Sequence, residues 1–159
     1  MTQRRDDQPA EEKLRLIALD GEDLAVLSAH LQDAILRVGD MVYLPDEQRF
    51  VLALNRFDWL ALEGGGAPHR AQTGLHFEKV RKVMLHGFRQ DRPDDILNLL
   101  DIEFIAGGEA PSGSVALVFS GGCALRLEVE CLEARMADLG PRRRVRRAPG
   151  HGTEGSGEA

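Results

Sequence analysis

The most constraining feature of this sequence is a segment near its C-terminal end that alternates apolar and polar residues and folds back on itself. Residues 115–119 are rich in β-formers, and apolar and charged residues then alternate through residues 124–130. Gly121 and Gly122 lie between the two runs, and glycine readily adopts the positive φ angles that tight hairpin turns require. The segment therefore predicts an antiparallel hairpin with one face in the core.

The same strand-like pattern recurs along most of the chain. Residues 14–19 predict a first strand, and residues 35–44 and 50–55 predict a hairpin. Residues 73–88 and 96–105 predict further extended segments. Because these runs mostly form hairpins and do not alternate with helices, an antiparallel sheet is expected and a parallel βαβ arrangement is not.

Two segments have helical spacing instead. Asp20 is placed to cap the start of a helix. Apolar residues follow it at three- and four-residue spacing, namely Leu24, Leu27, Leu31 and Ala34. A second helix is predicted at residues 131–139, since its larger side chains share one face and Gly140-Pro141 is a typical helix end.

Together these elements predict an α+β fold. We expect a bent antiparallel sheet or small barrel of about seven strands, with one helix after the first strand and a C-terminal capping helix. That order is similar to the pleckstrin-homology-like layout, an analogy that implies no function. Residues 1–13 are predicted to be a flexible leader, residues 14–140 a single domain, and residues 141–159 a disordered tail, first Arg-rich and then rich in Gly, Ser and Glu.

The charge of the chain is unevenly distributed. The net charge is −6. The tail nevertheless holds a group of arginines, namely Arg142, Arg143, Arg144, Arg146 and Arg147. An acidic body repels a phosphate backbone, and the tail has no interleaved aromatic residues, so specific nucleic-acid recognition is not expected. The tail arginines are interpreted either as a weak electrostatic contact with RNA, a membrane surface or an acidic protein, or as a solubilising segment. A third alternative is that the tail folds back on the acidic body.

The cellular compartment of the protein is inferred from its apolar stretches and its cysteines. It has no apolar stretch near the roughly 20 residues that a membrane helix needs, and the first residues do not resemble a secretory signal. Cys123 and Cys131 are its two cysteines. Few thiols are typical of a reducing compartment, so a cytoplasmic protein without membrane insertion is predicted.

The densest cluster of specific chemistry lies at residues 55–59. Asn55, Arg56, Asp58 and Trp59 offer an amide, a guanidinium suited to a carboxylate or phosphate, a carboxylate and an indole ring. They are the predicted binding residues. The alternative is structural: the aromatic residues end a strand in the core, and Arg56 pairs with Asp58 or another acid.

No reactive motif is recognised. Neither the histidines nor the two cysteines have the spacing of a metal site, so no metal, cofactor or catalytic residue is predicted. The favoured function is therefore a non-enzymatic binding or adaptor domain with a protein partner, or a homodimer through a sheet edge. The alternative is a small enzyme or ligand-binding protein whose site combines distant residues such as His30, Asp33, Arg56 and His76.

Three longer segments carry a family resemblance. They are residues 18–34, 49–59 and 127–135. In these segments the chain resembles an alphaproteobacterial family of conserved hypothetical proteins, domain of unknown function 2948. The resemblance implies a bacterial cytosolic protein, and it supplies no catalytic residue.

Overall fold

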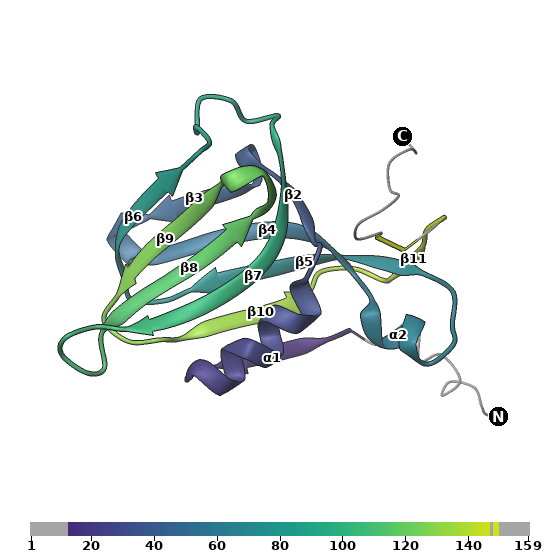
Figure 1. Ribbon diagram of the computed structural model, residues 1–159, viewed down its shortest axis with the longest axis horizontal. Coiled ribbons are helices and arrows are strands. Elements are labelled where there is room, and N and C mark those ends of the chain that lie inside the picture. Colours follow the sequence, from purple (N-terminus) through teal and green to yellow (C-terminus); the bar gives the residue numbers. More distant parts are fainter. Residues whose placement is uncertain (1–12, 147, 150–159) are drawn as a thin grey trace.

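The structure is a computed structural model that describes residues 13–146, 148 and 149 (Figure 1). Its described strands form one antiparallel sheet of eleven strands. The order is β1-β10-β5-β4-β2-β7-β8-β9-β6, with β3 beside β4 and β11 beside β5. The strands are β1 (Arg15–Ala18), β2 (Ile35–Arg37), β3 (Met41–Leu44), β4 (Arg49–Phe57), β5 (His69–Phe77), β6 (Val80–His86), β7 (Ile96–Ala106), β8 (Gly113–Phe119), β9 (Ala124–Val129), β10 (Ala134–Asp138) and β11 (Arg143–Arg144).

The bent sheet encloses the core between two layers. In Figure 1, β7, β8 and β9 lie in front of β4 and β5. The largest fully buried side chains come from both layers and include Phe50, Phe77, Phe119 and Leu117. Burial of these apolar side chains is the main contribution to the stability of the fold.

The helix α1 (Gly21–Leu31) forms where the Asp20 cap and the leucine spacing predict it. The Asp23 N–H donates to Asp20 Oδ1 at 2.8 Å, and Leu24, Leu27 and Leu31 are buried. The helix packs beside β7 and β1. Within the described residues, no helix is long and apolar enough to cross a membrane.

The predicted hairpins are confirmed. β8 and β9 pair antiparallel, and Gly121 and Gly122 between them have φ angles of 77° and 79°. β3 and β4 also pair antiparallel, around the short 3₁₀ turn Pro45–Glu47. The alternating pattern in these segments was therefore sufficient to predict local pairing.

The predicted C-terminal helix is wrong. Residues Ala134–Asp138 form β10, which pairs with β5 on one side and β1 on the other. Ala134, Met136 and Asp138 are buried while Arg135 is exposed, so the segment has a strand period of two as well as a helical spacing. Pairing on both edges of the segment decides between the two patterns.

The predicted strand number and the barrel are also wrong. The described part of the sheet contains more strands than the expected seven for four reasons. Residues 35–44 divide into β2 and β3, residues 73–88 divide into β5 and β6, β10 replaces a helix, and β11 is added. β1 and β6 lie at the two ends of the strand order and do not pair with each other, so the sheet does not close. The second helix is instead α2 (Trp59–Glu63), in the middle of the chain.

Candidate functional site

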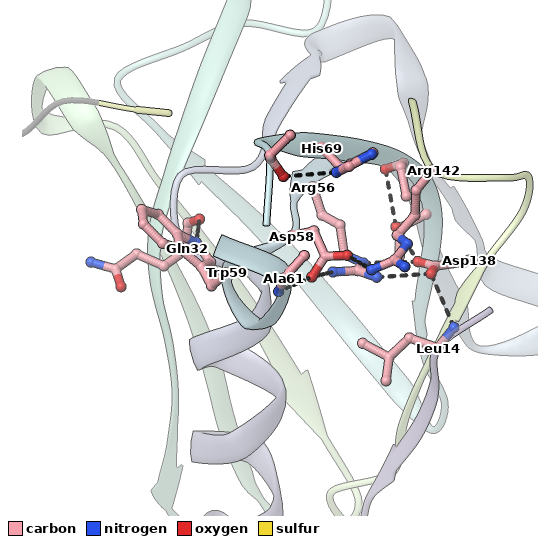
Figure 2. A network of polar contacts seen from close by, with 12 residues as sticks. Leu14, Gln32, Arg56, Asp58, Trp59, Ala61, His69, Asp138 and Arg142 are labelled. Atoms are coloured by element: carbon pink, nitrogen blue, oxygen red, sulfur yellow. Dashed lines mark hydrogen bonds and ion pairs between the residues drawn. The ribbon is translucent and has the colours of Figure 1, made fainter. Parts of the chain in front are cut away.

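The arginine of the predicted binding cluster lies inside the protein. Two nitrogens of Arg56 on β4 donate to the two carboxylate oxygens of Asp138 on β10, both at 2.8 Å (Figure 2). Thr73 on β5, the strand between them, donates its hydroxyl to Asp138 at 2.8 Å. The side chain of Arg56 is 3% exposed and that of Asp138 is 0% exposed. Arg56 and Asp138 therefore form a bidentate ion pair, and with Thr73 they link the three adjacent strands β4, β5 and β10.

Asp58 extends this pair into a network. Its side chain caps α2 by accepting a hydrogen bond from the Ala61 N–H at 3.1 Å. Its other oxygen accepts from Arg142, and an Arg56 nitrogen lies 4.0 Å from its carboxylate (Figure 2). The described arginines Arg143 and Arg144 form β11, whose residues lie opposite Arg70 and His69 of β5. The network thus joins the sheet, α2 and the C-terminal segment.

The charge of Asp138 is well stabilised. Burial by itself would raise the pKa of this carboxyl, but hydrogen bonds from Arg56, the Leu14 N–H and Thr73, together with the Arg56 charge, outweigh burial and lower the pKa below its ordinary value. Removing either partner of such a buried pair leaves the other charge buried without a countercharge. The chemistry of Arg56 is accordingly used for structure, which is the alternative expected from the sequence.

The remaining residues of the cluster point elsewhere. The Trp59 indole N–H donates to the Gln32 carbonyl at 2.9 Å, and its ring meets the edge of Phe57 at a centroid distance of 4.7 Å. Trp59 also lines a pocket of about 210 Å³ with Ala29, His30, Leu60 and Glu63. The Asn55 Oδ1 is buried without a hydrogen-bond partner in the described structure, beside Ile35 of β2. The four predicted residues therefore do not share one binding surface.

The distant residues proposed for an enzyme site are only partly brought together. His30 lies near the network: burial and the Arg56 charge lower its pKa, and the Asp138 charge opposes them. His76 instead contacts Glu78 at 2.5 Å. It faces Val51, five positions along β4 from Arg56, which corresponds to roughly 17 Å. His76 and Arg56 are therefore too far apart for a shared hydrogen bond. No group of three or more potential metal ligands occurs among the described residues.

The tail arginines are placed in part. Arg142 and Arg144 contribute to the C-terminal segment along β5, and Arg146 is exposed. Arg147 lies outside the described residues, as do residues 1–12 of the predicted leader and residues 150–159 of the predicted tail. The predicted domain boundaries and the role of these arginines stay predictions.

A cleft lies between α1 and β7, away from the predicted residues. Its volume is about 520 Å³, which is within the range of ligand pockets. One wall is a face of α1 with small side chains, Gly21, Ala25 and Ala29, and the other is residues 100–104 of β7. A second pocket of about 230 Å³ shares Gly21 and Phe104 and continues to Ala106. The two form a groove, here called the α1/β7 groove.

One edge of β7 opens into this groove. β2 covers that edge only at residues 96–98, whereas β8 covers the opposite edge from Leu99 to Ala106. The Ile102 N–H points away from β8 and donates to Ser28 Oγ of α1 at 2.9 Å. Because N–H groups alternate in direction along a strand, those of Phe104 and Ala106 also point away from β8. No backbone or side-chain partner from α1 or a loop reaches them in the described structure.

The groove is acidic. Asp101 and Glu103 of β7 line it, and Asp20 lines its continuation. A hydrogen bond and the negative charge of Asp101, with a smaller effect of desolvation, raise the pKa of Glu103. No Lys or Arg occurs among the residues that line the two pockets. The sequence did not predict this site because its residues look like ordinary strand and helix positions. The one sequence signal is the spacing of Asp101 and Glu103, two positions apart on β7.

The comparisons with known proteins identify the family. A family model described as "Protein of unknown function (DUF2948)" matches residues 14–151. The chain belongs to this family. The resemblance predicted from the sequence is thereby confirmed at the level of the family, while the alphaproteobacterial origin stays a prediction. Neither a curated protein nor a solved structure matches the chain.

Proposed function

We propose that this protein is a non-enzymatic binding domain that holds an extended segment of a partner protein along the open edge of β7. The observation that carries the proposal is the pair of outward N–H groups at Phe104 and Ala106, beside a groove of several hundred cubic ångströms. A strand edge of this kind binds peptides by main-chain hydrogen bonds, and side-chain pockets add selectivity.

The buried network argues against the alternative surface at residues 55–59. Arg56 and Asp58 are 3% and 2% exposed, and both already have charged partners. A ligand that reached Arg56 would have to displace Asp138 and leave a carboxylate buried without its partner, at a cost of several kcal/mol. The groove requires no such rearrangement.

The sheet edges at the two ends of the strand order, β6 and β1, are less suited to binding. β6 carries Arg81 and Lys82 and has an irregular register between Val80 and Lys82, and charges and bulges at an edge oppose strand pairing. β1 has four residues. Neither edge opens into a groove of comparable volume among the described pockets.

A peptide selection tests this function. A display library of random heptapeptides is selected against the wild-type protein, and the affinities of the enriched peptides are then measured for Ala106→Pro and Ala106→Ser. Proline at position 106 removes the outward N–H without removing a hydrogen bond to β8. Serine keeps this N–H and serves as the matched control. We expect about tenfold or greater loss of affinity for the proline variant and little change for the serine variant, with thermal unfolding used to check both folds.

Two results would count against the proposal. One is the failure of repeated selections to enrich any peptide. The other is equal affinity of the enriched peptides for both variants, which would locate binding at another surface, including one that joins two copies of this chain.

A further inference from the structure

We propose that the segment held in the α1/β7 groove is basic, and that its Lys or Arg side chains are recognised by the carboxylates of Asp101 and Glu103. This inference rests on the proposed function and adds the chemistry of the partner. It is carried by the placement of two acids on one face of β7, at the wall of the groove.

The first step is the fixed position of Asp101. Its Oδ1 accepts a hydrogen bond from the Ser28 hydroxyl at 3.0 Å and from the Ile102 N–H at 3.0 Å. These contacts orient the carboxylate toward α1 before any partner arrives. A preoriented acceptor binds a cation with less loss of side-chain entropy than a freely rotating one.

The second step is the missing countercharge. Two other strand carboxylates in the described structure lie near an arginine: Asp138 contacts Arg56 at 2.8 Å and Glu128 lies 3.5 Å from Arg126. Asp101 and Glu103 form no ion pair with a Lys or Arg of the described residues. They are instead next to each other, and like charges side by side are unfavourable until a cation joins them.

The third step is the shape of the groove. Ala25 and Ala29 on α1 and Leu100 and Phe104 on β7 are apolar lining residues. The hydrocarbon part of a Lys or Arg side chain packs against such a surface while its charged end reaches a carboxylate. The groove therefore fits a long cationic side chain better than a short or acidic one.

The register of strand pairing makes the inference more specific. Residues directly opposite one another in an antiparallel pair have their side chains on the same face, and alternate residues return to that face. Asp101 and Glu103 are two positions apart. A strand added beside the open part of β7 would thus place a basic residue opposite Glu103, and a long side chain there also reaches Asp101 diagonally, two positions along β7 beside Ser28 of α1.

The test compares heptapeptide selections on four versions of the full chain. They are the wild type, Glu103→Gln, the double variant Asp101→Asn/Glu103→Gln, and the control Asp46→Asn/Glu130→Gln. The control changes the net charge as the double variant does, at two exposed acids outside the groove. Glu103 is exposed, so the single variant is expected to keep the fold even if the double variant is less stable.

We expect peptides enriched on the wild type and on the control to contain an excess of Lys and Arg at the position that pairs with Glu103. These peptides should bind Glu103→Gln about tenfold more weakly, with a loss that shrinks as salt is raised. Glu103→Lys should recover binding to a peptide whose matching basic residue is changed to Glu.

The outcomes separate the two proposals. Enrichment without an excess of basic residues, or unchanged affinity for Glu103→Gln, would overturn this inference and leave strand addition at β7 intact. Equal weakening by the control pair would also overturn it, because overall charge and not the groove would then be responsible. Failure to enrich any peptide would reject the proposed function itself.

Discussion

Arg56 and Asp138 are 82 positions apart in the chain and form the most enclosed ion pair among the described residues. The sequence indicates that Arg56 is unusual, because this arginine lies between Asn55 and Phe57 at the end of an apolar, strand-like run. It does not indicate the partner, because Asp138 lies in a segment whose spacing also fits a helix. Which acid meets Arg56 depends on the insertion of β10 beside β5, a long-range event that local patterns do not specify.

Replacing Arg56 tests the structural role of this pair. Arg56→Met keeps the long side chain and leaves Asp138 buried without its partner charge, so a loss of about 3–5 kcal/mol in the free energy of unfolding is expected. The control is Arg37→Met, at a surface pair with Asp40 and Asp94 whose arginine side chain is 52% exposed. Its expected loss is below about 1 kcal/mol. Urea unfolding measures both, and equal losses would contradict the assignment.

The pH dependence of stability follows from the lowered pKa of Asp138. A carboxyl whose pKa is lower in the folded state stabilises the fold above its unfolded pKa, which is near 3.8. That contribution is lost as the pH falls through the folded value. The free energy of unfolding should therefore decrease between pH 5 and pH 2.5 by more in the wild type than in Asp138→Asn. Parallel curves for the two proteins would show that Asp138 does not have the expected charge-stabilising contacts.

At the scale of elements, local signals predicted most of the structure. α1 was predictable because its cap and its leucines lie within one short stretch of sequence. The β8–β9 hairpin was predictable because its two turn glycines lie directly between the strands they join. α2 was missed although Asp58 is a typical N-cap, since the five residues that follow have too few turns to show a period. β10 was misassigned because nine residues allow both a strand and a helical pattern.

The close packing of β7 against β8 gives a prediction at this scale. A Cβ added to Gly113 would lie 2.5 Å from the Ile105 carbonyl oxygen and 2.7 Å from the Phe104 ring. Gly113→Ala should therefore lower the free energy of unfolding by about 1–3 kcal/mol. Gly108→Ala in the neighbouring loop is the control, because nothing lies within 4 Å of its added Cβ. Chemical denaturation compares the two, and a neutral Gly113→Ala would contradict the register of β7 and β8.

At the scale of the whole molecule, the antiparallel fold could be predicted and the candidate site could not. Hairpins specify which strands are neighbours in sequence, and the α1/β7 groove arises where the sheet separates beyond β2 and α1 fills the space. The groove combines residues of α1 with residues about 70 positions later; Ser28 and Ile102 are 74 positions apart. Asp101 and Glu103 therefore look like solvent-facing strand positions until the helix is placed beside them.

The most direct test of the central claim is amide hydrogen exchange along β7, measured by NMR with and without a selected peptide. In the free protein the Phe104 and Ala106 amides should exchange much faster than those of Glu103 and Ile105, which point toward β8. Peptide binding should slow exchange at Phe104 and Ala106 by at least about tenfold. Protection of all four amides in the free protein, or protection by the peptide only at other strands, would contradict the claim that β7 has an open edge that binds a partner.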